Sequence, residues 1–249
     1  MLFRSYCNEK NDGAIFITDR YKSLVEKKYK INDLNICFPN YGSKDMILKK
    51  DEMYPKISSS TNKIHLVYVG ALDQDNPNIT RYLLPQMRQL SKQGFVIDIF
   101  PSKNDSYEKY KEINNVNIMD TQNPKSLIKI ISKYDCGLTL VNPNADNMPE
   151  ELKYGFWNKT FDYLMAGIPQ ITINIFSVIS DFISKNNFGI SVESLDQLEK
   201  NHSNLLKKFK PMEKNILQKN ELYTYEKKID SLYTFYDRVY KKFHQNRLN

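Results

Sequence analysis

Short apolar runs alternate with longer segments of helical periodicity through most of the chain. Six apolar runs have the character of buried strands: residues 64–69, 96–100, 116–119, 136–141, 170–173 and 189–192. Between them, apolar residues recur three or four apart, as in a helix, over residues 78–93, 124–133, 159–166 and 175–185. Strands that alternate with helices indicate a parallel sheet covered on both faces. The pattern therefore predicts an α/β fold with a Rossmann-like parallel sheet.

Further patterns lie on either side of this region. Residues 14–18 and 36–38 are predicted to be short strands, with a helix over residues 19–29 between them. A polar, lysine-rich stretch over residues 41–62 is predicted to be a linker. Residues 221–243 have the apolar stripe of one long helix, formed by Leu222, Ile229, Leu232, Tyr236, Val239 and Phe243.

Composition places the chain among ordinary globular proteins. Of its 249 residues, 41% are hydrophobic and 26% are charged, which argues against global disorder. Cys7, Cys37 and Cys136 are odd in number and far apart, so we expect a reducing compartment and no disulfide framework or structural zinc site. The first 13 residues lack the apolar run of a signal peptide, and no stretch approaches the ~20 apolar residues of a membrane-spanning helix. These features predict a cytoplasmic protein.

The net charge of +7 is concentrated in one part of the chain. Residues 201–249 hold 11 Lys and Arg against 5 Asp and Glu. A basic segment can contact phosphates or anionic lipid headgroups at the inner face of a membrane, or it can be a solvated helix face in a lysine-rich sequence. Its tyrosines can stack on nucleic acid, but several fall on the apolar stripe, so packing is the favoured interpretation. We expect no nucleic-acid partner.

Familiar catalytic and metal-binding motifs are absent. The chain has no G-x-G-x-x-G, no P-loop and no G-x-S-x-G. His65, His202 and His244 are isolated and lack the spacing of metal ligands, and His65 is expected to be a packed residue within a strand. The sequence predicts no metal site and assigns no catalytic residue.

The most informative segment is residues 155–172, GFWNKTFDYLMAGIPQIT. Asn158 is predicted to be the N-cap of a helix. The free amides of the first turn, around Asn158 to Thr160, lie at the positive end of the helix dipole, and Lys159 adds a cation. Asp162, one turn further on, carries a carboxylate that can accept hydrogen bonds from the two hydroxyls of a ribose. One helix end would thus recognise both parts of a nucleoside diphosphate.

A structural interpretation competes with this one. An Asp in the first turn of a helix is stabilised by the dipole without any ligand. A Lys beside it is common on protein surfaces. The residues alone leave both interpretations open.

The run NKTFDYLMAGIP resembles the donor-site motif of family-4-type retaining glycosyltransferases of the GT-B fold, which carry Lys-x-x-Glu-Tyr-Leu-x-x-Gly-x-Pro. The matching positions are Lys159, Tyr163, Leu164, Gly167 and Pro169. Asp162 stands where the family has the second of two glutamates, which implies that it holds the ribose hydroxyls. The first glutamate would be Tyr154 here, so the match is incomplete, and Glu150 and Glu151 are out of register with it.

Other parts of the chain resemble the same family. The run IHLVYVGAL resembles the opening strand and phosphate-side loop of the second GT-B domain, which implies that Gly70 lets that loop approach the phosphates or the sugar. The Tyr-Asp pair at Asp135 matches the segment before the donor motif. Residues 12–40 resemble the end of the first domain, and the last helix resembles the one that crosses back to it. The resemblance divides the chain into a first-domain remnant with its linker (1–57), a nucleotide-sugar-binding domain (58–220) and a crossing helix (221–249).

The resemblance implies a function. The chain would be the donor-binding half of an enzyme that moves a sugar from a nucleoside-diphosphate sugar to a saccharide or lipid-linked acceptor, in surface polysaccharide synthesis, with retention of configuration and without a metal or other cofactor. Most of the first, acceptor-binding domain is not in the sequence. The chain is therefore expected to be a fragment, or a subunit whose partner chain supplies that domain. The alternative is a non-catalytic nucleotide-sugar-binding subunit or inactive remnant.

Overall fold

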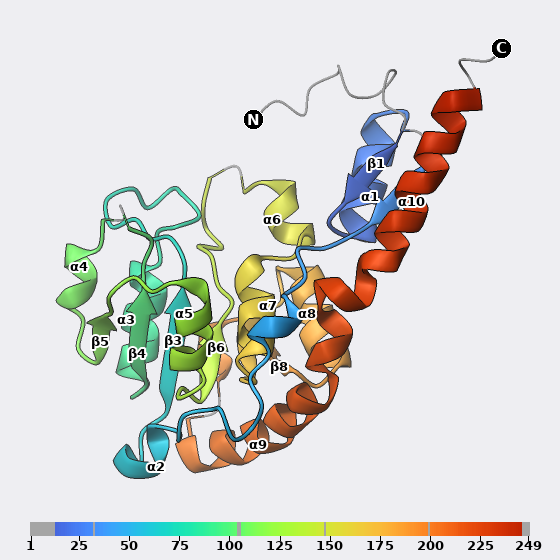
Figure 1. Ribbon diagram of the computed structural model, residues 1–249. Helices are drawn as coiled ribbons and strands as arrows, with labels where there is room; N and C mark the ends of the chain where they lie inside the picture. Colours follow the sequence, from blue (N-terminus) through green and yellow to red (C-terminus); the bar gives the residue numbers. More distant parts are fainter. Residues whose placement is uncertain (1–12, 32, 104–105, 147, 199, 246–249) are drawn as a thin grey trace.

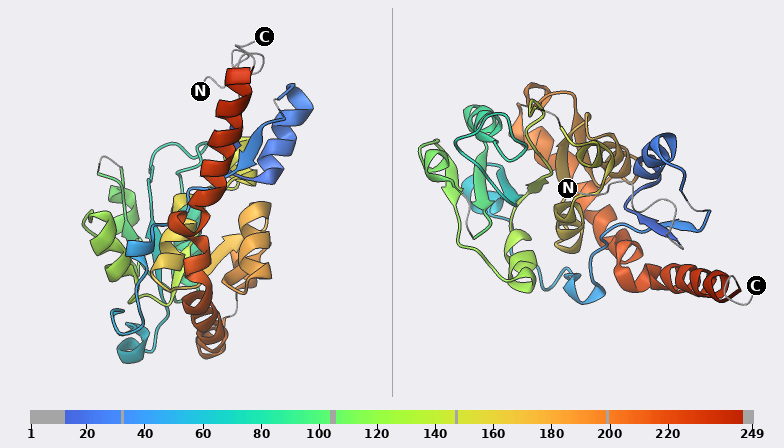
Figure 2. Two further views of the ribbon diagram at one scale, coloured as in Figure 1. Left: turned by 45° about the vertical axis from the view of Figure 1, so that its right-hand side comes forward. Right: turned by 90° about the horizontal axis from the view of Figure 1, so that it is seen from above.

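A computed structural model describes residues 13–31, 33–103, 106–146, 148–198 and 200–245. Its centre is a six-stranded sheet in the order β5-β4-β3-β6-β7-β8, and every neighbouring pair is parallel. The strands are β3 (His65–Val69), β4 (Val96–Phe100), β5 (Val116–Ile118), β6 (Cys136–Leu138), β7 (Gln170–Ile173) and β8 (Gly189–Val192). Helices flank the sheet on both faces (Figures 1 and 2). The predicted Rossmann-like α/β fold is confirmed.

The helices follow the strands along the chain. In the sheet region they are α2 (Ser58–Thr61), α3 (Leu84–Lys92), α4 (Glu108–Lys111), α5 (Pro124–Ile131), α6 (Glu150–Tyr154), α7 (Asn158–Met165) and α8 (Ser177–Lys185), with the 3-10 turn η2 (Leu195–Gln197). The central strands are buried on both faces: Leu66, Val67, Ile97, Ile99 and Ile171 are all without solvent exposure. This burial explains why these strands are continuous apolar runs rather than alternating ones.

A small unit precedes the sheet. It consists of β1 (Ala14–Phe16), α1 (Asp19–Lys28) and β2 (Asn35–Cys37), and its two strands are parallel. The predicted linker follows and contains the 3-10 turn η1 (Lys44–Met46). The linker packs back on the sheet domain, where the Leu48 amide donates to the Met165 carbonyl oxygen over 3.0 Å. The boundary proposed at residue 58 stays a prediction.

Two long helices complete the chain. They are α9 (His202–Lys219) and α10 (Tyr225–Gln245), joined by the 3-10 turn η3 (Asn220–Tyr223). The sequence analysis identified α10 but missed α9, which contains a proline at position 211. In Figures 1 and 2, α10 extends away from the sheet beside β1 and α1. The rings of Phe38, directly after β2, and Tyr225, at the start of α10, pack edge to face with centroids 5.8 Å apart. This contact joins α10 to the N-terminal unit.

One predicted helix was too long. The segment 78–93 was expected to be helical throughout, but α3 begins only at Leu84. Side chains bind the backbone before it: the Asn76 Oδ1 accepts from the Asn78 amide over 3.0 Å, and Nδ2 of Asn142 donates to the Ile79 carbonyl oxygen over 3.1 Å. Asx-type bonds such as that of Asn76 compete with helix formation. Residues 73–83 therefore form a loop at the carboxyl edge of the sheet.

Within the described ranges, no helix combines the length and apolar character that crossing a bilayer requires. The same ranges hold no group of three or more His, Cys, Asp or Glu side chains that could bind a metal ion. Cys37 and Cys136 are free thiols, and Cys7 lies outside the described residues. His65 is buried, as predicted, with Nε2 3.0 Å from the Thr61 hydroxyl.

Candidate functional site

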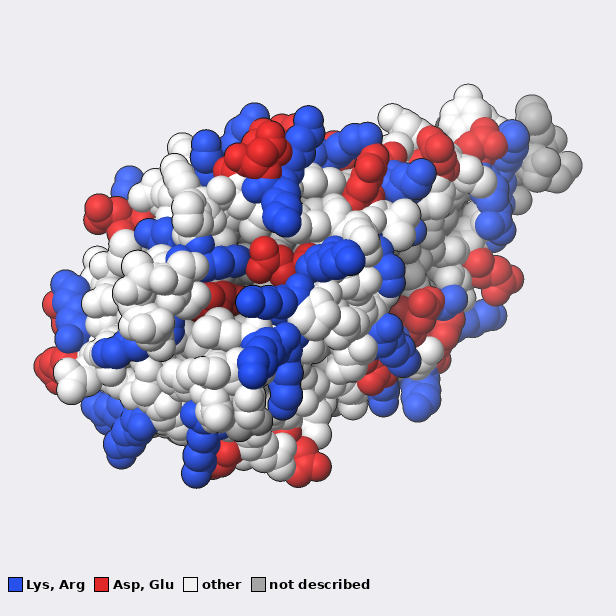
Figure 3. All heavy atoms as spheres, turned by 90° about the horizontal axis from the view of Figure 1, so that it is seen from below, with Lys and Arg blue, Asp and Glu red and all other residues white. Residues whose placement is uncertain are grey.

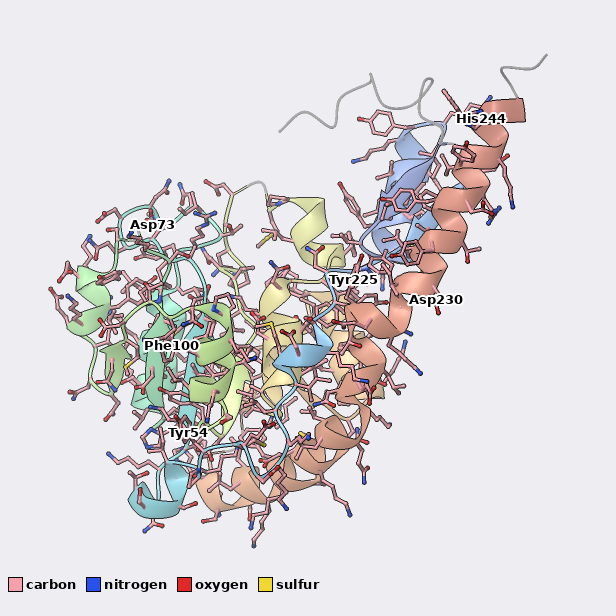
Figure 4. All side chains as sticks on the ribbon, viewed as in Figure 1. Tyr54, Asp73, Phe100, Tyr225, Asp230 and His244 are labelled. Atoms are coloured by element: carbon pink, nitrogen blue, oxygen red, sulfur yellow. The ribbon has the colours of Figure 1, made fainter. Side chains whose placement is uncertain are left out.

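The carboxyl ends of the strands and the first turn of α7 meet at one edge of the molecule. Asp73, which follows β3, marks this edge in Figure 4, and Tyr54 marks the opposite edge. The loop after β3 begins at Gly70, whose amide donates to the Phe100 carbonyl oxygen at the end of β4 over 3.1 Å. Open parallel sheets bind their ligands at this edge. The structure thus places the predicted donor-site helix where a ligand of this fold would bind.

Tyr163 holds α7 against the sheet. Its hydroxyl oxygen accepts from the Val69 amide over 3.1 Å and lies 3.2 Å from the carbonyl oxygens of Val67 and Leu138, to which it can donate. Its ring packs on Gly137 of β6 so closely that a Cβ there would lie 2.5 Å from ring atoms. The glycine is therefore required for the close approach of helix and strand. These contacts fix the start of α7 beside the end of β3.

Lys159 lies between the start of α7 and the end of β3. Its ammonium nitrogen is 3.8 Å from the centroid of the Tyr68 ring, which is a cation–π contact. It would also lie 3.1 Å from a Cβ added at Gly70, whose φ of +140° disfavours other residues in any case. Gly70 thus leaves room for the Lys159 side chain. The structure brings Gly70 and Lys159 together.

The two ionisable groups of the site are shifted towards their neutral forms. Burial lowers the pKa of Lys159 to about 7, although the carboxylate of Asp162 opposes the shift. Burial likewise raises the pKa of Asp162 to about 6, although Lys159 opposes it. No ion pair joins the two side chains, and within the described residues Asp162 has no side-chain hydrogen bond. A partly buried cation held on a ring face, beside a partly buried carboxylate that lacks a hydrogen-bond partner among the described residues, is typical of a binding site.

Two predictions about this helix were wrong in detail. Asn158 is not the N-cap, which is Trp157; Asn158 is the first helical residue, and its Oδ1 accepts from Nδ2 of Asn40 over 3.2 Å. The Thr160 amide was expected to be free and is not, and the side chain is fully buried, with no partner for Oγ1 within the described residues. Its amide donates to the Trp157 carbonyl oxygen over 2.9 Å. The free backbone amides of the first turn are therefore those of Asn158 and Lys159.

The surroundings of Lys159 differ from those of a lysine on the protein surface. Lys159 is partly buried and rests on the Tyr68 ring instead of extending into solvent. Sequence reasoning missed Tyr68. Its position two residues before Gly70 could have indicated Tyr68, because alternate residues of a strand point to the same face.

Tyr154 has a structural role instead of the role of the first family glutamate. Its carbonyl oxygen accepts from the Thr18 hydroxyl, and its ring lies under the guanidinium of Arg20, 5.4 Å from the centroid. Tyr154 thus joins α6 to the N-terminal unit. Glu150 and Glu151 are the first two residues of α6.

Comparison with protein families matches residues 66–227 to the family described as glucosyltransferase 3-like, C-terminal domain. The match covers the sheet from β3 onwards, the donor-site helix α7, and the start of α10. None of the curated proteins compared with the chain matches it.

Solved structures of glycosyltransferases share the fold. Sucrose-phosphate synthase from Thermosynechococcus elongatus aligns with a TM-score of 0.62 and 11% identity over 92% of this chain and 58% of its own. A chain of the GtfA/B complex aligns with a TM-score of 0.61 and 13% identity over 92% of this chain and 46% of its own. Anabaena Alr3699/HepE in complex with UDP-glucose aligns with a TM-score of 0.58 and 11% identity over 96% of this chain and 65% of its own.

The chain thus spans less than two thirds of the length of each of these three proteins. At these identities, the alignments establish the fold alone. Together with the family match, they confirm the resemblance to glycosyltransferases of the GT-B fold.

Proposed function

Because this chain belongs to the glucosyltransferase 3-like family through its C-terminal domain, we propose that it is the donor-binding half of a glycosyltransferase. It binds a nucleoside-diphosphate sugar and transfers the sugar to a saccharide or lipid-linked acceptor in surface polysaccharide synthesis. The observation that carries the proposal is the meeting of Lys159, Asp162 and Gly70 at the carboxyl edge of a parallel sheet. That Anabaena Alr3699/HepE, with the same fold, was solved with UDP-glucose supports the donor class.

Each residue has a role that follows from its position. The free amides at the start of α7, with the positive end of its dipole, bind the diphosphate together with Lys159. The Asp162 carboxylate, which lacks a protein partner among the described residues, accepts from the ribose hydroxyls. Gly70 lets the loop after β3 approach the diphosphate or the sugar. Asn158 contributes its backbone amide, and Thr160 supports the turn from within the core.

The reaction needs stabilisation of a leaving anion. The bond from the anomeric carbon to the diphosphate oxygen breaks, and the electron pair leaves with the nucleoside diphosphate. The acceptor oxygen forms the new bond to that carbon, and its proton passes to the departing diphosphate. The α7 amides and protonated Lys159 stabilise the charge that grows on the leaving diphosphate. By the family resemblance, configuration is retained and no metal or other cofactor takes part. No residue of this chain is assigned as the catalytic base.

A second candidate function is a nucleotide-sugar-binding subunit that acts with a partner chain supplying the acceptor domain. The observation that favours it is the fold shared with a chain of the GtfA/B complex, which is itself an assembly. The two candidates share the donor site and differ in turnover. Transfer by the purified chain alone would decide for the first.

The donor site is tested by the melting temperature of the chain with UDP, GDP and their sugars. A ligand at about 100 times its Kd adds ~2.7 kcal/mol of stability, so the melting temperature should rise by several degrees. The rise should be lost or strongly reduced in Asp162→Asn and Lys159→Met. The control Asp181→Asn makes the same change at an exposed position of α8 and should keep the full rise.

The melting temperature of Asp162→Asn without ligand is a control for its folding. Burial raises the pKa of Asp162, so the charged carboxylate costs stability at neutral pH. Asp162→Asn removes that cost, and its melting temperature without ligand should equal or exceed that of the wild type. A wild-type chain whose melting temperature responds to none of the nucleotides would remove the proposal.

A further inference from the structure

A basic groove lies at the amino edge of the sheet, on the opposite side of the molecule from the start of α7. Residues 58–59 and Asp135, which line it, precede β3 and β6, and the linker and α9 form its walls. Its volume is about 1140 Å³. Figure 3 looks at this face from below and shows Lys and Arg side chains around a hollow that has acidic side chains within it. The groove includes seven lysines: Lys44, Lys49, Lys50, Lys56, Lys207, Lys210 and Lys214.

Among the described residues, acids pair with two of these lysines. Lys44 lies 2.6 Å from a Glu221 carboxylate oxygen, and Lys56 lies 3.4 Å from one of Glu213. The third carboxylate of the lining, on Asp135, is occupied by hydrogen bonds from within the protein. The other five lysines have no acidic partner within the described part of the chain. The groove therefore carries positive charge that the protein does not balance.

The unpaired lysines come from two separate walls. Lys207, Lys210 and Lys214 are three and four residues apart on α9 and so share one side of that helix. Lys49 and Lys50 belong to the linker. All five are exposed. Like charges around one hollow repel one another, and a bound anion would remove this repulsion.

We propose that the basic groove binds a soluble molecule that carries two or more phosphate groups. Lysine ammonium groups bind phosphate as point charges, and two walls of lysines suit an anion with more than one phosphate. The volume of the groove is comparable to that of small-molecule sites. Leu206, Phe209 and Leu217 add apolar surface for the rest of such a molecule. A flat bilayer would reach only the rim, so the concave shape favours a soluble ligand.

Hydrogen bonds join both walls of the groove to the last turn of α7. Leu48 of the linker donates to the carbonyl oxygen of Met165, the last residue of α7. Asn220, at the end of α9, donates through Nδ2 to the Leu164 carbonyl oxygen over 3.4 Å. A ligand that bridges linker and α9 therefore holds both against the carboxyl end of the helix whose other end is the proposed donor site.

The test titrates the full chain with tripolyphosphate by calorimetry in 0.15 M salt, roughly physiological ionic strength. We expect saturable binding that Lys210→Gln/Lys214→Gln weakens about tenfold, because it removes two of five unpaired charges. The matched control Lys27→Gln/Lys28→Gln makes the same charge change on α1 and should bind like the wild type. Tripolyphosphate should also slow tryptic cleavage after Lys49 and Lys50.

Three outcomes would overturn the proposal. Equal weakening in the control pair would mean unspecific attraction to a basic protein. Loss of binding in Lys159→Met, with the groove variant unaffected, would place the probe at α7 instead. Finally, phosphatidylcholine vesicles containing phosphatidylglycerol form the membrane arm: vesicle binding that needs Lys210 and Lys214, without tripolyphosphate binding, would assign the groove to a lipid surface. Melting curves of both double variants confirm that they fold.

Discussion

At the scale of single residues, the donor site combines two opposite charges that the protein keeps partly from water. Burial is the larger influence on both pKa values, and it lowers that of Lys159 and raises that of Asp162. The mutual attraction of the two groups opposes both shifts without cancelling them. The two pKa values, about 7 and about 6, therefore lie close together near neutral pH.

This closeness predicts a narrow pH range for binding of UDP or GDP. Diphosphate binding needs protonated Lys159, which is lost as the pH rises through about 7. Ribose binding needs ionised Asp162, which is lost as the pH falls through about 6. Affinity measured by calorimetry should therefore be greatest between these values and fall several-fold by pH 9.

The alkaline limb of that profile is the diagnostic part. The nucleotide itself takes up a proton near pH 6, so the acid limb has two sources. Lys159→Met should bind weakly at every pH and show no fall between pH 7 and 9. An affinity of the wild type that stays constant over that interval would contradict the assigned role of Lys159.

At the scale of elements, the position of α7 depends on a buried tyrosine rather than on a helix cap. Trp157, at the N-cap position, makes no side-chain capping bond. The hydroxyl of Tyr163 instead links the helix to the backbones of β3 and β6. The direction in which the first turn of α7 points is therefore set by the contacts of Tyr163, further along the helix.

Tyr163→Phe should destabilise the protein by about 1–3 kcal/mol, because it leaves the partly buried Val69 amide without an acceptor. Urea unfolding measures this loss. Tyr233→Phe removes the same hydroxyl from a side chain on α10 that is 66% exposed, and it should change stability very little. Equal effects of the two substitutions would mean that the Tyr163 hydroxyl does not hold α7.

At the scale of the whole molecule, α10 connects the N-terminal unit to the sheet domain. Phe235, which is 6% exposed, and Val239 pack where Gly13 enters β1. The Thr18 hydroxyl and Arg20 attach the same unit to Tyr154 of α6. The small unit thus depends on contacts from two distant parts of the chain.

Phe235→Ala should therefore loosen the N-terminal unit and leave the large sheet intact. Truncating a buried phenylalanine costs about 3–5 kcal/mol, and here the loss falls on a unit with only two short strands. Hydrogen exchange at the amides of β1 and β2 should accelerate, while exchange in β3 and β4 should not change. Tyr236→Ala, at an exposed neighbouring position, should leave both regions as in the wild type.

The sequence by itself determined the alternation of strands and helices and the place of the donor-site helix. Buried parallel strands must be continuous apolar runs, and Gly167 with Pro169 must end a helix, so both features are visible in the residue order. The motif at Lys159, Asp162 and Tyr163 was visible for the same reason, since its spacing is local. The limits of the long helix at 78–93 were not visible, because side chains of the loop compete for its backbone.

Only the tertiary structure decided how these parts meet. The contact of Lys159 with Tyr68, the burial of Thr160 and the packing of Tyr154 against the N-terminal unit all join residues distant in sequence or depend on burial by such residues. The basic groove likewise brings together lysines of the linker and of α9. Local periodicity reports which residues are apolar, whereas burial, pKa shifts and charge clusters depend on which distant segments lie against each other. For that reason the helix could be found in the sequence, but the state of its charges could not.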